Sequence, residues 1–181
     1  GLSFYFVGAA TYNDAYREVS ENDLKKMMPI SLLFMIFILF FIFRTIEGVV
    51  IPILLVGIVI IPTMGLSAIL GFKFDNLSSA LPGVLIAICL ADSIHILTTY
   101  YRNLEKGGER NEAILSSLMK NLVPTFLTSF STMIGFFSLT QTELVPVQNL
   151  GVLAGFGTFY AWFLTIFLVC PLLKFIPYRP L

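Results

Sequence analysis

An aspartate and the only histidine of the chain lie three residues apart in an apolar segment, LADSIHILTTY, at residues 90–100. In a helix, Asp92, His95 and Thr99 share one face, at positions i, i+3 and i+7. A carboxylate at mid-membrane costs about 2.5–3.5 kcal/mol on insertion scales. Asp92 is therefore protonated part of the time, matched by His95 and hydroxyl groups, or reached by water. Each condition would let the site take up and release a proton.

A second line of hydroxyl groups follows in the next apolar segment. Its members are spaced i, i+3, i+4 and i+7 on one helical face: Thr125, Thr128, Ser129 and Thr132. Two helices that each carry one polar line are expected to face each other or a shared cavity. The two lines together form a candidate proton or ion relay, although serine and threonine in membranes often serve packing alone.

Two other readings of these residues stay open. Asp92 and His95 could form a static polar clamp that holds helices together. A metal site is disfavoured, because one histidine and one aspartate supply too few ligands. Cys89 and Cys170 lie in apolar runs and are expected to be small buried hydrophobic residues. No cofactor is expected.

The composition places these helices in a membrane. Of the 181 residues, 57% are hydrophobic and 12% are charged, about half of the charged fraction usual in soluble domains. A membrane helix needs about 20 mostly apolar residues. Five segments qualify, at about residues 27–43, 49–70, 77–101, 121–140 and 147–173. The predicted fold is an all-α, five-helix transmembrane bundle over residues 27–176.

The segments outside the spans are polar. Residues 1–26 are interpreted as the tail of an extracytoplasmic domain, with a strand in LSFYFVGAA (residues 2–10) and a helix capped by Asn13. An amphipathic linker helix is predicted over residues 109–120, after the Gly107-Gly108 pair. Residues 177–181 are a predicted cytoplasmic tail.

Basic residues favour one orientation of the bundle. With the amino end outside the cytoplasm, seven of the 11 Lys and Arg residues fall on the cytoplasmic side and four outside, as the positive-inside rule prefers. The predicted location is the inner (cytoplasmic) membrane, with an extracytoplasmic amino terminus and a cytoplasmic carboxyl terminus. The formal net charge is zero, so nothing in the charge favours a nucleic-acid partner.

The last span carries a line of small residues, Gly151, Gly155 and Thr158. Small residues at this spacing let helices approach closely in membranes. We therefore expect these three residues to serve helix packing.

Three segments resemble the membrane half of resistance-nodulation-division (RND) transporters, closest to the MMPL-type and hopanoid-exporter branch, which is similar to sterol-sensing domains. They are LPGVLIAICLADSIHILTTYYRNLEKGGERNEAI, LVPTFLTSFSTMIGFFSL and NLGVLAGFGTFYAWFLTIFLVCPLL. The resemblance implies helices two to six of a repeated six-helix half. It also implies that Asp92 occupies the proton-coupling acidic position, with Thr128 and Thr132 in the hydroxyl-rich relay helix.

The expected function is the membrane domain of a proton-driven exporter of lipids or other hydrophobic compounds. No second copy occurs within the 181 residues, so we expect a second transmembrane half, from the same longer chain, a copy or another subunit. The alternatives are a sterol-sensing-like lipid-binding module and a structural membrane subunit. Motifs of hydrolytic enzymes are absent from the sequence, and no enzymatic activity is expected.

Overall fold

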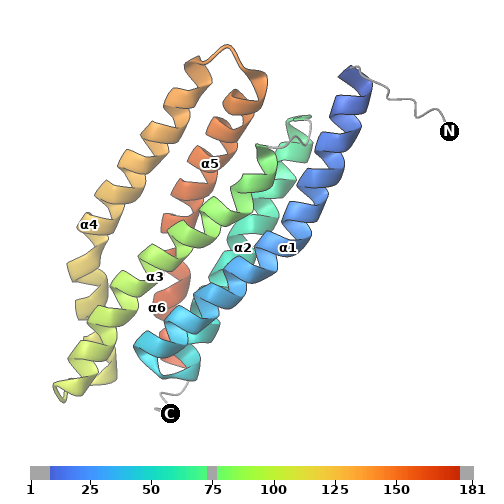
Figure 1. Ribbon diagram of the computed structural model, residues 1–181. Coiled ribbons are helices and arrows are strands. Elements are labelled where there is room, and N and C mark those ends of the chain that lie inside the picture. The colour runs from blue at the N-terminus through green and yellow to red at the C-terminus, as the bar shows by residue number, and fades with distance from the viewer. Residues whose placement is uncertain (1–8, 73–76, 176–181) are drawn as a thin grey trace.

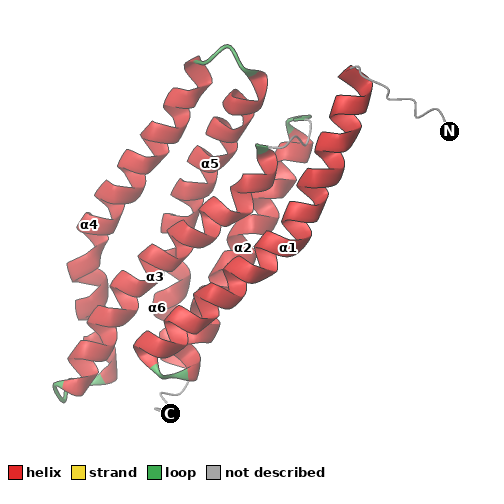
Figure 2. Ribbon diagram, in the orientation of Figure 1, coloured by secondary structure: helices red, strands yellow, loops and turns green. Residues whose placement is uncertain are grey.

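The computed structural model describes residues 9–72 and 77–175, with side chains described from residue 25 onward. Five helical segments are long and apolar enough to cross a membrane, which confirms the predicted five-helix bundle (Figure 1, Figure 2). The elements are α1 (Ala9–Phe43), α2 (Ile46–Ile69), η1 (Ser78–Ala80), α3 (Leu81–Glu105), α4 (Arg110–Ser138), η2 (Leu139–Gln141), α5 (Val145–Leu164), η3 (Thr165–Val169) and α6 (Cys170–Phe175).

Helix α1 is longer than the predicted first span. It is continuous from Ala9 to Phe43, and its membrane-crossing part is Lys25–Phe43. The predicted cap at Asn13 is wrong, because Asn13 lies inside the helix. Ala9 and Ala10 of the predicted strand are helical, and residues 2–8 lie outside the described residues. Adding a residue to an existing helix gains one hydrogen bond, whereas a strand needs a partner for its backbone.

Helix α4 joins two elements that the sequence predicted as separate. The predicted linker helix at 109–120 and the span at 121–140 form one helix, Arg110–Ser138. Its buried residues keep a spacing of four or eight throughout: Ala113, Ser117, Thr125 and Ser129. Because that pattern passes through residues 120 and 121 unbroken, one face stays in contact with α3 and the helix continues.

The last span contains an interruption that the sequence analysis did not predict. In place of one helix over 147–173, the chain forms α5, the π-helical turn η3 and then α6. Pro171, which lacks an N–H, lies directly after this turn. A π turn holds one extra residue, so the side chains of α6 are rotated by about 100° relative to a continuous α-helix.

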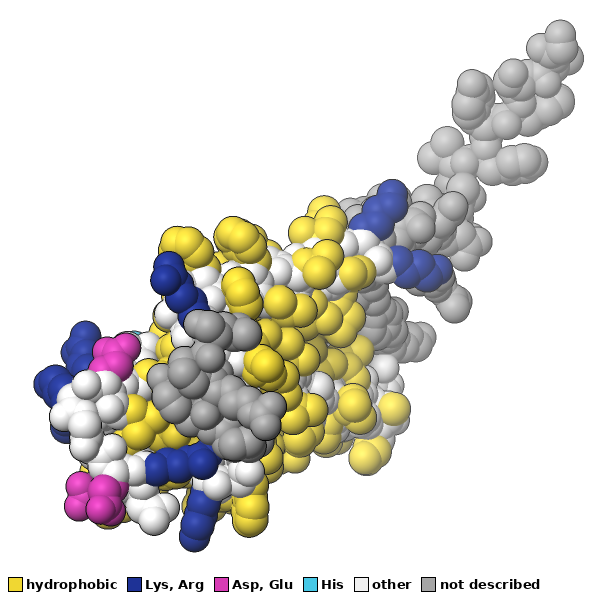
Figure 3. Space-filling model, turned by 90° about the horizontal axis from the view of Figure 1, so that it is seen from below, with side chains coloured by type: hydrophobic (Ala, Val, Ile, Leu, Met, Phe, Trp, Pro, Cys, Tyr) yellow, Lys and Arg dark blue, Asp and Glu magenta, His cyan; other side chains and the backbone are white. Residues whose placement is uncertain are grey.

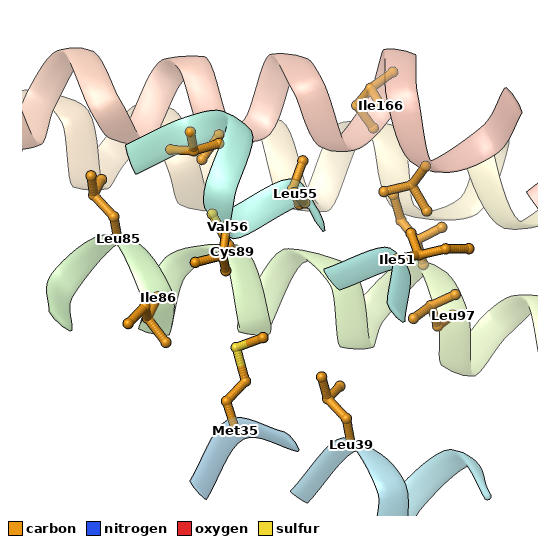
Figure 4. Close-up of a cluster of buried hydrophobic side chains, with 14 of the residues drawn as sticks. Met35, Leu39, Ile51, Leu55, Val56, Leu85, Ile86, Cys89, Leu97 and Ile166 are labelled. Carbon is orange, nitrogen blue, oxygen red and sulfur yellow. The ribbon is translucent and has the colours of Figure 1, made fainter. Parts of the chain in front are cut away.

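Helix α3 belongs to one of the two most buried spans of the bundle. Half of its membrane-crossing window is buried, as is half of the window in the last span, Val145–Phe175, against 11% for α1 and for α4. Its apolar face packs with α1, α2 and η3 in a common core (Figure 4). This core includes Met35, Leu39, Ile51, Leu55, Val56, Leu85, Ile86, Cys89, Leu97 and Ile166. The position of α3 is thus fixed from several sides by close packing.

Helices α4 and α5 form an antiparallel hairpin (Figure 1) in which glycine permits close contact. A Cβ atom at Gly151 would lie 2.6 Å from the Phe136 carbonyl oxygen and 2.9 Å from the Leu139 Cβ. A Cβ atom at Gly155 would lie 3.0 Å from the Phe137 ring. The backbones of the two helices can approach this closely only because neither position carries a side chain.

Two further small residues lie on α5. Thr158 is fully buried, and its hydroxyl donates to the Ala154 carbonyl oxygen at 2.6 Å. Gly157, which the sequence analysis did not single out, lies against α3, where an added Cβ would be 2.6 Å from Leu85 Cδ2. Small residues of α5 therefore face both α4 and α3.

We predict that Gly151→Ala lowers the free energy of unfolding by about 1–3 kcal/mol, since overpacking against a backbone carbonyl forces the helices apart. The matched control is Gly135→Ala, on exposed α4 surface with no atom within 4 Å of an added Cβ. There the better helix propensity of alanine should leave stability unchanged or raised by up to about 1 kcal/mol. Thermal unfolding in detergent checks both variants. Equal stability of the two would contradict the close contact.

Candidate functional site

Polar groups line the contact between α3 and α4. The Ser117 hydroxyl donates to the Ile96 carbonyl oxygen at 2.5 Å, and the Asn121 side-chain amide donates to the Thr99 hydroxyl at 2.9 Å. Farther along the same contact, the Ser129 hydroxyl donates to Asp92 Oδ2 at 3.4 Å. The two helices run antiparallel (Figure 1) and are joined by polar contacts between residues 92–99 of α3 and 117–129 of α4.

Asp92 lies at the middle of the 25-residue helix α3 and is only 5% exposed. Ser129 is equally buried. Their contact is at the long end of the hydrogen-bond range, so the carboxylate is weakly satisfied. The adjacent Ser93 hydroxyl is buried without a hydrogen-bond partner. The site therefore combines a buried carboxyl group with a single, long hydrogen bond from a hydroxyl donor.

Thr125 connects this contact to α5. It is 2% exposed, donates to the Asn121 carbonyl oxygen at 2.6 Å, and accepts the Trp162 indole N–H at 3.3 Å. The Trp162 ring packs edge-on against Phe126, with centroids 5.0 Å apart. The sequence analysis did not assign Trp162 to the site, although a lone tryptophan inside an apolar helix with a polar N–H needs a partner.

The predicted relay residues divide into two groups. Asp92, Thr125 and Ser129 are buried and Thr99 is half-buried. The other members are exposed: His95, Thr128 and Thr132. Among the described residues, no hydrogen bond or ion pair joins His95 to Asp92.

The two exposed threonines are satisfied within α4. Thr128 donates to the Pro124 carbonyl oxygen at 3.1 Å, and Thr132 donates to the Thr128 carbonyl oxygen at 2.8 Å. These hydroxyl groups therefore need no partner from α3. The i−4 carbonyls satisfy them in the way usual for threonine on a helix.

The exposed members lie on one side of the α3–α4 pair. His95 and Thr132 each follow a contact residue, Asp92 or Ser129, by three positions. In antiparallel helices, a step of three residues turns both side chains to the same side of the pair. Helix α5 covers the other side, through Gly155 against Phe137. We name His95, Thr128 and Thr132 the polar face.

Glu47 is a buried carboxylate that falls between the predicted spans 27–43 and 49–70. It lies in the first turn of α2, is 2% exposed, and its Oε1 has no hydrogen-bond partner. Thr45 caps this helix by accepting the Gly48 N–H at 3.2 Å, and its hydroxyl donates to the Tyr101 hydroxyl at 2.8 Å. A threonine cap with an acidic first turn is a helix-start signal that could have located it.

We predict that Thr125→Val lowers the free energy of unfolding by about 0.5–1.5 kcal/mol, because the Trp162 N–H loses its acceptor. Thr128→Val is the matched control, since its exposed hydroxyl bonds only to α4 backbone, and it should change stability little. Unfolding of both variants in the same detergent measures the difference. Equal losses would show that the indole contact contributes nothing.

Comparison with known proteins places the chain among membrane proteins. Residues 1–176 match the MMPL family. The membrane protein YdgH of Bacillus subtilis is 28% identical over 162 residues, covering 86% of this chain and 18% of that protein. The membrane protein MJ1562 of Methanocaldococcus jannaschii is 23% identical over 157 residues, covering 87% of this chain and 40% of that protein.

A third relative carries a functional name. The hopanoid transporter HpnN of Rhodopseudomonas palustris is 27% identical over 121 residues, covering 67% of this chain and 14% of that protein. No solved structure matches the chain. The chain spans less than half the length of each of these relatives. The resemblance read from the sequence is confirmed, and the chain belongs to the MMPL family.

Proposed function

We propose that this chain is the membrane domain of an RND-type exporter of lipids or other hydrophobic compounds, driven by the proton-motive force, with Asp92 as the group that carries the proton. One observation supports this most directly. The Asp92 carboxyl group is 5% exposed at the middle of α3, and no ion pair within the described residues neutralises it. Intramembrane carboxyl groups of this kind mark proton or ion pathways.

A proton on Asp92 would change the α3–α4 contact. The charged carboxylate accepts the Ser129 hydroxyl, and the neutral acid adds a donor of its own. The two forms therefore favour different arrangements of hydroxyl groups along the contact. A conformational equilibrium responds to a proton only when its two states bind that proton differently. The carboxyl–hydroxyl contact supplies such a difference.

The partner that we infer is a second transmembrane half. The His95 imidazole of the polar face is exposed in this chain. An imidazole turned to hydrocarbon is unfavourable, and intramembrane histidines usually face a bundle interior or a cavity. A second half, from the same longer chain, a copy or another subunit, would cover the face. His95 and Thr132 would then join a relay that spans both halves.

The substrate class and the orientation belong to the same proposal. The relative named as a hopanoid transporter favours a lipid or another hydrophobic compound as cargo. The distribution of basic residues favours an amino end outside the cytoplasm and a carboxyl end inside it, and we propose the inner membrane as the location. Residues 1–26 would then begin on the side where an extracytoplasmic domain handles the substrate.

We predict that Asp92→Asn in the full-length protein reduces proton-driven lipid transport to the rate measured with an uncoupler present. The amide keeps the shape and accepts the Ser129 hydroxyl but cannot release a proton. The change in unfolding free energy should be within about 1 kcal/mol. Transport into reconstituted vesicles, with and without a pH gradient, provides the measurement.

Ser131→Ala is the control, because Ser131 lies on the exposed surface of α4; it should transport at the wild-type rate. If Asp92→Asn transported lipid at the wild-type rate, Asp92 would have no role in a proton relay. A large loss of stability with residual coupled transport would instead indicate a polar clamp. Lipid binding that is unchanged by the uncoupler and by Asp92→Asn would favour a sterol-sensing-like module.

A further inference from the structure

A groove of about 420 Å³ lies between the first turns of α4 and helix α6. It is separate from the Asp92–Ser129 contact, since it begins at Asn111 and ends near Leu118 on α4. Seven residues of helix correspond to a length of about 10 Å. The site is an open groove on the surface of the bundle rather than an enclosed cavity.

The lining of the groove is apolar with one positive charge. Helix α4 contributes Ile114, Leu115 and Leu118. Helix α6 contributes Pro171 and Phe175, together with Lys174, the single charged residue of the lining. Lys174 is exposed, so its ammonium group is accessible while its methylene chain lies along apolar surface.

Two features of the chain build this groove. The π turn η3 directly precedes α6 and rotates its side chains, which brings Cys170, Pro171 and Lys174 to the groove. Arg110 then donates from Nη2 to the Leu173 carbonyl oxygen, a carbonyl in the last turn of α6 that has no partner within its own helix. This bond holds α6 against the start of α4 and keeps the groove in place.

The groove opens at the basic end of the bundle. At this end α1, α3 and α6 finish and α2 and α4 begin. Figure 3 looks at this end and shows Lys and Arg side chains around its rim, with Asp or Glu side chains among them and hydrophobic flanks beside them. Its described basic residues are Arg44, Arg102, Lys106, Arg110 and Lys174, and its acidic residues are Glu47, Glu105, Glu109 and Glu112. The apolar part of the groove therefore runs toward the hydrocarbon, and its cation lies at the membrane surface.

We propose that this groove binds an anionic phospholipid from the leaflet at the basic end, with an acyl chain on the α4 and α6 side chains and the phosphate at Lys174. The arrangement of charge favours a lipid as the occupant. An apolar groove with one cation at its interfacial end matches a lipid with a negative headgroup. A packed helix would need a contact surface along much of the bilayer, about 30 Å thick, and this groove is about 10 Å long.

The test uses the full-length protein reconstituted with phosphatidylethanolamine and phosphatidylglycerol, and native mass spectrometry counts the phospholipids that stay bound in mild detergent. Lys174→Gln should lower phosphatidylglycerol occupancy roughly fivefold, the loss expected for one lysine near an anionic surface. Phosphatidylethanolamine should change little. Leu115→Trp, at a position 60% exposed, fills the groove and should displace the lipid without unfolding the protein.

Lys106→Gln is the matched control, because Lys106 is exposed at the same end but does not line the groove; its phosphatidylglycerol occupancy should equal that of the wild type. Equal losses of phosphatidylglycerol occupancy in both lysine variants would show an effect of general surface charge and contradict a specific site. Wild-type occupancy in Leu115→Trp, or no retained phosphatidylglycerol in the wild type, would overturn it as well. Proton-coupled transport is measured separately, so a failure of lipid binding would not contradict it.

Discussion

The structure depends on one constraint: polar groups that lie in hydrocarbon must find their partners within the protein. The α3–α4 contact meets it with Ser117 against a carbonyl, Asn121 against Thr99, and Ser129 against Asp92. The first two bonds are short and join neutral groups. The third is 3.4 Å long and includes a carboxyl group. The contact is thus firm near the basic end of the bundle and loose at its middle, where a change of protonation would have the most effect.

Much of this was predictable because a membrane simplifies the reading of a sequence. Long apolar runs fix the number of helices, since no other open structure satisfies its backbone in a bilayer. Spacing of three and four placed Asp92 and Ser129 on facing sides of α3 and α4, where the structure has them in contact. The relay role itself stays a prediction.

Other features of the fold and the site depend on packing between helices, which the periodicity of the sequence does not reveal. A four-residue hydroxyl stripe is wider than one helix contact, so Thr125 and Ser129 turn inward while Thr128 and Thr132 turn outward. The π turn η3 and the continuous helix across residues 120 and 121 are set by packing against neighbours, which local sequence does not report. Glu47 was misplaced because a charged residue next to a span is expected in a loop, whereas here it begins a helix.

The unbroken course of α1 has a mechanical consequence. Its 35 residues make a rod about 52 Å long, of which a bilayer core about 30 Å thick covers little more than half. Pro29 lies inside this helix and removes one of its backbone hydrogen bonds. Where the helix moves as one rigid body, a tilt of about 10° at its carboxyl end would displace the opposite tip by about 9 Å. Small rearrangements among buried side chains at one end of α1 would in this way become larger displacements at its amino end.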